Sequence, residues 1–319
     1  MFKPLIALAT LAAVSTTGPA QAANTKVTVS QAFQSMLYLP LYVGIDEGLF
    51  AKEGLDIDKE TAGSASAALS AVLSRSADLS LHGPEWVAIA AAKGAPVRIV
   101  ANVVNGAAVW IVATPDFPFT SVKDLKGQTI VTGSMPTTST SLFLKLLKES
   151  GMDAEKDISM IQVPLGSEIG PLVAGQGKVA VMYEPGVDQA VAKGMKVVLG
   201  FPKLYGPYGF SDMAARTDAD PVMLEHFIVG LNHALHYIQT NVPGSIAIAK
   251  KEFPTLDPAV VEAAVNRMVA DGVYPPTVEI TPEALKLGLD TQIALGNLAA
   301  QPDFKTFVAT DLIAKAVGK

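Results

Sequence analysis

"DEGLFAKEGLDID", residues Asp46 to Asp58, ends a helix twice in a short space and then begins a strand. The amphipathic residues in front of it favour a helix. Gly48 and Gly54 are each suited to end a helical turn, because glycine takes the left-handed conformation without steric cost. The apolar side chains of Leu55 and Ile57 alternate with acids, as in a strand with one buried face. The stretch therefore predicts a helix that returns the chain over a sheet into the next strand.

The alternation of strands and helices extends in both directions from this stretch. Residues 26–33 alternate apolar and polar side chains like a strand, and residues 64–76 and 84–94 follow as helices with strands between them. A second, similar series begins near residue 109 and ends near residue 201. This order is typical of an α/β protein built on mainly parallel sheets with helices on their faces.

After about residue 220 the pattern is purely helical, with helices expected at 221–241, 245–253, 258–271 and 282–298. Helices cannot extend a sheet, so we expect this C-terminal tail to pack on the first α/β series. The sequence thus predicts two lobes and two hinge crossings. Lobe 1 would comprise 23–110 and 211–319, lobe 2 would comprise 111–210, and the crossings would lie near 110 and at 205–211.

The N-terminus has the features of a secretory signal. Lys3 is followed by the apolar run Leu5–Val14, and Ala20–Ala22 forms an A-x-A cleavage site, so we expect residues 1–22 to be a signal peptide that is removed. Ten apolar residues are too few for a membrane anchor. The chain contains no cysteine, so neither disulfides nor a lipid-bearing cysteine is available. We therefore expect a soluble protein of the periplasm.

The composition narrows the class of partner. The chain has 319 residues, half of them hydrophobic, which is enough for two cores, and its net charge is −6. A mildly acidic protein is a poor ligand for nucleic acid, which is bound by basic surfaces. We therefore expect no nucleic-acid partner.

The stretch from Leu39 to Gly83, "LPLYVGIDEGLFAKEGLDIDKETAGSASAALSAVLSRSADLSLHG", resembles the start of a known family. It is similar to the periplasmic solute-binding proteins of the nitrate/sulfonate/taurine and thiamine-pyrimidine-precursor type. The likeness continues through "VAVMYEP" to the tail "ITPEALKLGLDTQIALGNL" and covers essentially the whole mature chain. The resemblance implies a periplasmic-binding-protein type II fold whose two lobes close on a small solute. It also implies a monomer without cofactors that delivers the solute to the membrane permease of an ABC importer.

The candidate ligand-binding residues lie in loops at strand ends, where ligands of open α/β sheets bind and where the resemblance places the cleft. They are Gln34, Ser35, Tyr38, Gly63, Ser64, His82, Trp86, Ser134, Thr137, Thr138, Ser139, Tyr183, Glu184 and Tyr208.

Each loop also has a simpler structural interpretation. On that interpretation Ser64 is an ordinary helix cap, His82 and Trp86 are core residues, and the loop around Tyr208 is a plain linker. In favour of a site, Gly63 lets the backbone approach a ligand at a helix N-terminus, which binds anions. Residues 134–141 carry six hydroxyls, more than capping needs.

Glu184 would discriminate most sharply between ligand classes. A carboxylate beside Tyr183 attracts a cation or an N–H donor and repels a sulfonate or nitrate. The four arginines are Arg75, Arg98, Arg216 and Arg267, and none falls in these loops, which disfavours a ligand clamped by an Arg fork. A small anion held by helix N-termini and a nitrogen heterocycle facing Glu184 both stay open.

Two other functions compete with solute binding, while a third, the ligand-sensing module of a receptor or regulator, lacks an accompanying helix-turn-helix, transmembrane helix or signalling domain in this sequence. An enzyme of the same fold acting on a pyrimidine precursor is the first, but the synthase subfamily carries a cysteine-rich segment that this chain lacks, and no G-x-S-x-G or H-E-x-x-H motif occurs. Metal capture is the second, because His226, His233 and His236 fall on one expected helix. We expect no enzyme activity, no cofactor and no metal site.

Overall fold

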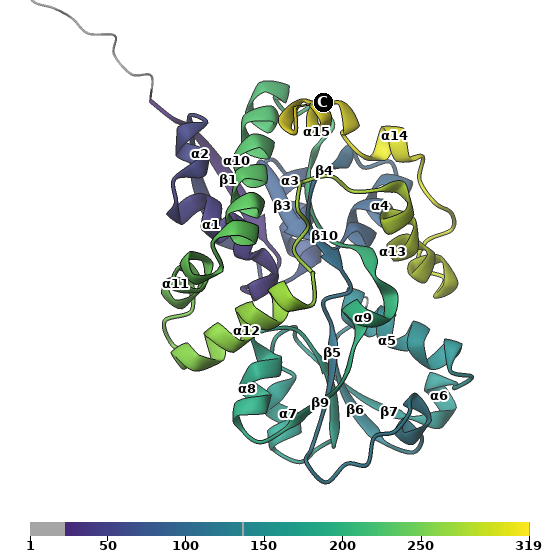
Figure 1. Cartoon of the computed structure of the whole chain (residues 1–319). Helices are drawn as coiled ribbons and strands as arrows, with labels where there is room; N and C mark the ends of the chain where they lie inside the picture. Colours follow the sequence, from purple (N-terminus) through teal and green to yellow (C-terminus); the bar gives the residue numbers. More distant parts are fainter. Residues whose placement is uncertain (1–22, 136, 319) are drawn as a thin grey trace, which may run out of the picture.

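The computed structural model describes residues 23–135 and 137–318. The expected signal peptide, residues 1–22, lies outside the described residues. Figure 1 shows two α/β units, one above the other, with the middle of the chain forming the lower unit. Within the described part of the chain, no helix has the length and apolar character needed to cross a membrane.

The upper unit is built on a five-stranded sheet with the order β2-β1-β3-β10-β4. β1 pairs in parallel with β2 and β3, whereas β10 pairs antiparallel with β3 and β4. The strands are β1 (Thr25–Gln31), β2 (Leu55–Thr61), β3 (Leu79–His82), β4 (Val97–Gly106) and β10 (Pro207–Arg216).

The lower unit repeats this arrangement in the order β7-β6-β8-β5-β9. β6 pairs in parallel with β7 and β8, whereas β5 pairs antiparallel with β8 and β9. The strands are β5 (Trp110–Ala113), β6 (Thr129–Gly133), β7 (Ser159–Val163), β8 (Val179–Met182) and β9 (Lys196–Gly200).

Each sheet is mixed, but four of its five strands run in one direction. The strand that runs against the other four is β10 in the upper sheet and β5 in the lower sheet. The reversed strand is the one that follows a crossing from the other sheet. β5 follows β4 of the upper sheet, and β10 follows β9 and α9 of the lower unit. The expectation of mainly parallel sheets flanked by helices is confirmed in this sense.

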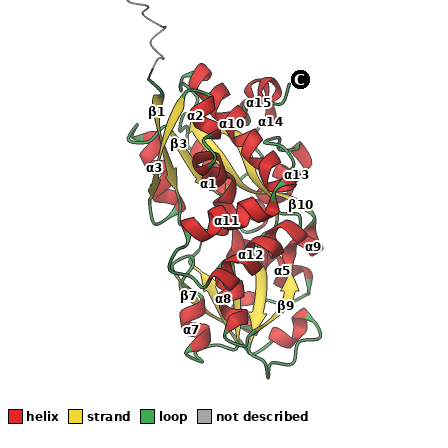
Figure 2. Cartoon of the chain, turned by 60° about the vertical axis from the view of Figure 1, so that its left-hand side comes forward, coloured by secondary structure: helices red, strands yellow, loops and turns green. Residues whose placement is uncertain are grey.

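Helices flank both sheets, as Figure 2 shows. Those of the upper unit before the first crossing are η1 (Met36–Tyr38), α1 (Leu39–Asp46), α2 (Leu49–Lys52), α3 (Ala65–Leu73) and α4 (Pro84–Ala92). Those of the lower unit are η2 (Val122–Leu125), α5 (Thr138–Glu149), α6 (Ala154–Asp157), α7 (Ile169–Val173), α8 (Gly186–Ala192) and α9 (Phe201–Tyr205).

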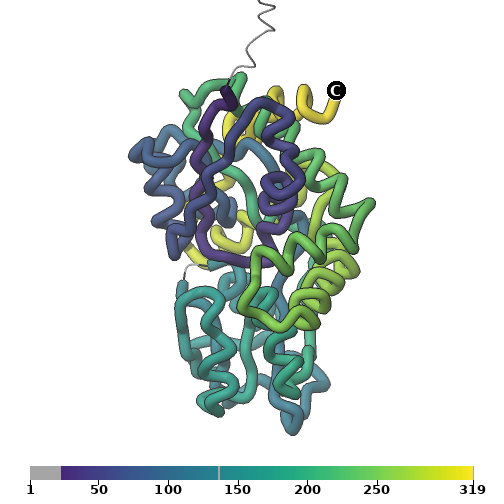
Figure 3. Tube along the Cα trace, turned by 90° about the vertical axis from the view of Figure 1, so that its left-hand side faces the viewer, coloured from purple at the N-terminus to yellow at the C-terminus, as the bar shows by residue number. Residues whose placement is uncertain are grey.

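The C-terminal helices return to the upper unit, which confirms the expected helical tail (Figure 3). α10 packs against α1 and α2, and α13 packs against β10 and α4, while α12 also contacts α8 of the lower unit. These helices are α10 (Pro221–Thr240), α11 (Val242–Glu252), α12 (Pro258–Ala270), α13 (Pro282–Ala294), α14 (Phe304–Phe307) and α15 (Thr310–Ala316).

The stretch from Asp46 to Asp58 folds as its glycines predict. Gly48 has φ of +62° between α1 and α2, and Gly54 has φ of +75° between α2 and β2. Both values lie in the left-handed region, which favours glycine. The chain thus passes from β1 through two short helices into β2, its parallel neighbour.

Two positions of the second crossing require glycine, each for a different reason. Gly206 has φ of +64° with ψ of −145°, a conformation that is essentially restricted to glycine. Gly209 has no such backbone need, but a Cβ there would lie 3.2 Å from the Cα of Leu285 in α13. Position 209 therefore requires a small residue, because α13 packs closely on β10.

Candidate functional site

A small cavity lies where loops of the two units meet. About 20 Å³ of it is open to the centres of water-sized molecules, which is room for one or two waters. The upper unit contributes Ala32, Phe33, Leu37, Tyr38, Ala65, His82, Gly83, Glu85, Trp86, Phe210 and Ser211, and the lower unit contributes Thr137, Thr138, Leu165 and Tyr183.

Strand ends place most of these residues. Phe33 follows β1, His82 ends β3, Thr137 follows β6 and Tyr183 follows β8. These four strands run in parallel within their sheets, so their carboxyl ends meet at one edge of each sheet. The two edges face each other across the cavity.

Aromatic rings form much of the cavity wall. The ring of Phe33 lies 5.7 Å from that of Tyr183 in a stacked arrangement, and 5.5 Å from that of Tyr38. Phe210 meets Tyr183 edge to face at 5.8 Å. These centroid distances are those of attractive aromatic pairs, and the Phe33–Tyr183 pair joins the two units.

Glu85 is the acidic residue of the cavity wall. It lies in the first turn of α4 with 3% of its surface exposed, and its Oε1 accepts a hydrogen bond of 2.7 Å from Thr138 Oγ1 of the lower unit. Burial raises the pKa of Glu85 to about 7, because desolvation disfavours the charged carboxylate more than the Thr138 hydrogen bond favours it. Glu85 is thus a carboxyl that is close to half protonated at neutral pH.

His82 is buried beside Glu85. Its Nδ1 lies 3.0 Å from the backbone oxygen of Gly83, and its Nε2 lies 3.0 Å from Ser80 Oγ. Desolvation lowers the pKa of His82 to about 4, so the imidazole is neutral at pH 7. The carbonyl of Gly83 requires the proton on Nδ1, so Nε2 accepts the hydrogen bond from Ser80.

The hydroxyl-rich segment 134–141 is engaged in internal hydrogen bonds. Thr138 donates to Glu85, and Thr140 Oγ1 donates to the Gly133 carbonyl at 2.7 Å. The backbone N–H of Ser139 donates to the Tyr183 hydroxyl at 2.9 Å. Burial is the main reason that the pKa of Tyr183 is raised, so this hydroxyl stays neutral.

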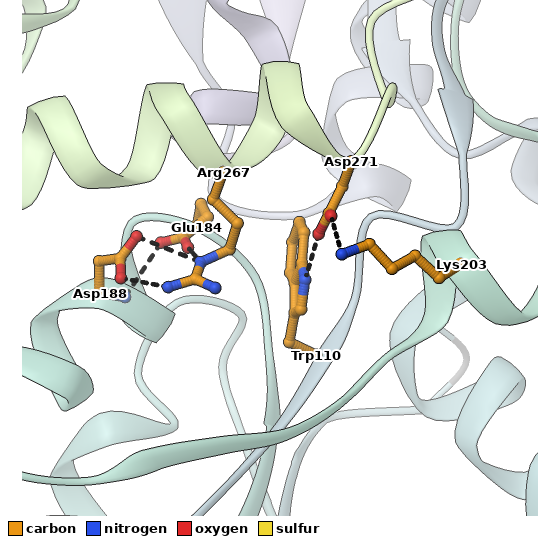
Figure 4. Close-up of polar contacts among 6 residues, drawn as sticks. All are labelled: Trp110, Glu184, Asp188, Lys203, Arg267 and Asp271. Atoms are coloured by element: carbon orange, nitrogen blue, oxygen red, sulfur yellow. Dashed lines mark hydrogen bonds and ion pairs between the residues drawn. The ribbon is translucent and has the colours of Figure 1, made fainter.

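The carboxylate of Glu184, which the sequence predicts to face the ligand, does not line this cavity. Its Oε1 accepts a hydrogen bond of 2.8 Å from Arg267 Nε, and Arg267 also pairs with Asp188 at 2.5 Å (Figure 4). Burial and the neighbouring Asp188 carboxylate raise the pKa of Glu184, while the Arg267 guanidinium opposes that rise. Glu184 and Asp188 therefore share a partner that α12 brings from a distant part of the sequence.

Six of the fourteen sequence-based candidates line the cavity: Tyr38, His82, Trp86, Thr137, Thr138 and Tyr183. Within the described residues the others lie outside its wall. Tyr208 is buried under α13, where its hydroxyl lies 3.0 Å from Thr291 Oγ1. Gln34 Nε2 donates to Glu252 Oε1 at 2.9 Å, and Ser35 Oγ donates to the Glu184 carbonyl at 2.8 Å.

The remaining candidates take local roles. Ser64 Oγ caps α3 by accepting from the Ala67 N–H at 3.1 Å, and Ser134 Oγ donates to the Val163 carbonyl at 3.0 Å. Gly63 has φ of +85°, which its position in front of α3 requires. Ser139 lies behind the wall and acts through its N–H on Tyr183.

Sequence reasoning did not identify Phe33, Glu85, Leu165, Phe210 and Ser211 as part of the wall. The sequence does contain a signal for Glu85. This acid comes directly after the "HGP" turn, which begins with the candidate His82 at the end of a strand. Phe210 and Leu165 carry no such signal, since an apolar side chain in a loop or strand reads equally well as core.

The histidine helix does not assemble a metal centre in the described structure, where no group of three or more His, Asp or Glu side chains is placed to hold an ion. His226 Nδ1 donates a hydrogen bond of 2.8 Å to the Glu53 carbonyl. His233 and His236 are exposed on α10.

Known proteins resemble this chain in sequence or in structure. The Bacillus subtilis (strain 168) protein YtlA, whose name describes it as a binding protein, is 27% identical over 79% of this chain and 78% of its own. The alkanesulfonate-binding protein SsuA of Xanthomonas axonopodis pv. citri superposes with a TM-score of 0.71, at 20% identity over 93% of this chain and 99% of that one.

Two further solved structures show how widely the fold is used. The nitrate-binding protein NrtA of Synechocystis PCC 6803 gives a TM-score of 0.73, at 16% identity over 92% of this chain and 89% of that one. The desulfurization enzyme DSZB gives 0.69, at 10% identity over 92% and 99%. At these identities the structural likeness establishes the fold that the chains share.

The family follows from a direct sequence match. Residues 36–238, which are more than half of the chain, match the model of one family, and they include η1, both crossings and all of the cavity wall except Ala32 and Phe33. The chain therefore belongs to the family described as NMT1/THI5 like.

Proposed function

We propose that this protein is the extracytoplasmic solute-binding subunit of an ABC importer, capturing a small organic or nitrogen- or sulfur-containing solute between two lobes. One observation carries the proposal: the cavity has walls from both units, and the units are joined by two chain crossings. The names of SsuA, NrtA and YtlA as binding proteins support the same class.

The cavity size supports capture by movement of the lobes. Room for one or two waters is too little for an organic solute, so binding requires the walls to move apart and close again. The lobe boundaries proposed here are 23–110 with 211–319, and 111–210. Closure around the solute then presents one shape of the protein to a membrane permease.

Native mass spectrometry of the protein purified from the periplasm tests this proposal. We expect a species heavier than the mature chain by one small molecule, and the released molecule should stay chemically unchanged after long incubation with the protein. Turnover of the molecule would favour the enzyme alternative instead. A Phe33→Ala variant should lose the bound molecule or bind it about tenfold or more weakly, because a wall contact is removed.

The matched control is Phe304→Ala, which removes an equally sized, partly buried ring from α14, far from the cavity wall. It should retain the molecule. Equal loss from both variants would show that Phe33 acts on folding and not on binding.

A further inference from the structure

One buried carboxyl group lines the cavity from the upper unit, and a second lies behind its wall in the lower unit. Glu85 belongs to the wall of the upper unit and is 3% exposed. Glu168, which precedes α7 in the lower unit, is 2% exposed, and its Oε1 has no hydrogen-bond partner within the described structure. A buried acceptor without a partner is costly unless something else supplies the donor.

The surroundings of Gly133 show how close Glu168 lies to the wall. A methyl group added at Gly133 would lie 3.3 Å from Glu168 Oε1, 3.4 Å from Thr137 Oγ1 and 2.7 Å from Leu165 Cδ2. Thr137 and Leu165 both line the cavity. The unpartnered oxygen therefore lies directly beside the lower wall, and the absence of a side chain at Gly133 makes room for it.

These acids have no cation nearby to balance them. The described cavity wall contains neither lysine nor arginine, and His82 is neutral at pH 7. Asp212 adds a third buried carboxyl close enough to Glu85 to raise its own pKa, and both of its oxygens lack partners among the described residues. Arg267 is already held by Glu184 and Asp188.

Two of the donors at the start of α5 that could hold an oxyanion are already used. The first-turn hydroxyl of α5, Thr138, donates to Glu85, and the N–H of Ser139 donates to Tyr183. At α3 the Ser64 hydroxyl accepts from the helix and offers no positive charge. A sulfonate or nitrate entering this cavity would thus meet the carboxyl of Glu85 and several aromatic side chains.

The aromatic wall suits a positively charged ligand. The rings of Phe33, Tyr38 and Tyr183 lie within 5.7 Å of at least one neighbour in this group, and Trp86 and Phe210 complete the wall. Aromatic faces attract cations as well as other rings. Acids and rings together describe a receptor for a positively charged, flat molecule.

We propose, on the basis of the solute-binding function above, that the solute is a small organic cation with N–H donors, such as a protonated amine or amidinium on a flat ring. Its N–H groups reach Glu85 and Glu168 from opposite sides, and its ring packs against Phe33 and Tyr183. The uncompensated carboxyls, with pKa values of about 7 for both Glu85 and Glu168, regain their charge when the cation arrives.

A thermal-shift screen followed by calorimetry tests the charge of the solute. The library contains organic cations, neutral amides and oxyanions, and it includes benzamidine, benzamide, benzoate and benzenesulfonate as a set on one ring. We expect the tightest-binding solute to be cationic and the shift to fall from benzamidine to benzamide to benzoate. If the tightest solute is neutral or anionic, this inference is overturned while the solute-binding function stands. If no solute in the library stabilises the protein, both proposals fail.

Two variants locate the cation. Glu85→Gln and Glu168→Gln should each weaken binding of the tightest cation by about tenfold to a hundredfold, because each removes a charge-assisted hydrogen bond. Glu60→Gln, an exposed position on edge strand β2, loses the same charge at a distance and should change affinity less than about twofold. Unchanged affinity in both cavity variants, with cooperative melting that shows them to be folded, would place the cation elsewhere and overturn the assignment.

Discussion

At the scale of single residues, the environment of a carboxyl decides its role. Glu184 and Glu85 are both buried acids next to the junction of the two units. Glu184 has Arg267 at 2.8 Å, whereas Glu85 has only the hydroxyl of Thr138. Glu184 is thus paired with a cation, whereas Glu85, on the proposal above, is the acid that meets the ligand.

Glu85 should make the protein less stable as the pH rises. The pKa of its carboxyl is about 7 in the folded protein, compared with 4.5 for an unperturbed glutamate such as that of the unfolded chain. The folded state therefore binds the proton more tightly. Its contribution to the free energy of unfolding is present below about pH 4.5 and is lost as the pH rises through 7. Relative to the parent, Glu85→Gln should therefore gain about 3 kcal/mol between pH 4.5 and pH 8.

Urea unfolding of both proteins at the two pH values measures this gain. His82 acts in the opposite direction, since its lowered pKa costs stability as the pH falls, but it is present in both proteins and cancels in the difference. The exposed Glu60→Gln variant should show no such pH-dependent gain. A constant difference between Glu85→Gln and the parent would mean that Glu85 ionises freely in the fold.

At the scale of elements, α12 joins the two units with side chains one turn apart. Arg267 binds Glu184 and Asp188 of the lower unit, and Asp271 at the end of the helix accepts from Trp110 Nε1 at 3.0 Å (Figure 4). Lys203 of α9 adds an ion pair of 3.3 Å to Asp271. A helix of the C-terminal tail thus fixes residues at both chain crossings.

Replacing Arg267 should be costly. Arg267→Met leaves Glu184 and Asp188 buried without a cation, and we expect the free energy of unfolding at pH 8 to fall by about 3–5 kcal/mol. Part of this loss should return at pH 5, where the orphaned acids can take up protons. Urea denaturation at both pH values measures the two effects.

The matched control for this prediction is Arg75→Met. Arg75 pairs with Asp218 on the surface, where both side chains are at least half exposed, so the loss should be about 0–1 kcal/mol. Similar losses for Arg75→Met and Arg267→Met would show that the buried cluster contributes no more than a surface ion pair.

At the scale of the whole molecule, two units, each built on one sheet, are joined by two crossings and have a cavity between them. The units touch directly through the Phe33–Tyr183 stack and the Thr138–Glu85 hydrogen bond. Contacts of this kind across a cavity define a closed arrangement, and a solute larger than water must separate them on entry.

A solute can enter only while the units are apart, so we expect the free protein to be open in solution and small-angle scattering to detect closure. Adding the tightest solute at 100 times its dissociation constant should reduce the radius of gyration and stabilise the fold by about 2.7 kcal/mol. A library member that gives no thermal shift serves as the control and should change neither quantity. Stabilisation without compaction would mean that the solute binds without movement of the lobes.

Local sequence determined the backbone path. Gly48 and Gly54 take the left-handed conformation that ends a helix, and Ser64 caps α3, because these are preferences of a residue and its immediate neighbours. The order of strands and helices followed from the same local patterns, whereas the family was recognised from the resemblance of short motifs in a specific order. The short helices α14 and α15 escaped prediction because they are too brief to show a helical period.

The tertiary structure alone decided which side chains meet. Arg267 reaches Glu184 across 83 positions, Thr138 reaches Glu85 across 53, and Ser139 meets Tyr183 across 44. A carboxylate in a loop looks the same in the sequence whether a distant arginine covers it or not. Its charge, and hence its use for a ligand, depends on the desolvation and partners that only the docking of the two units and α12 supplies.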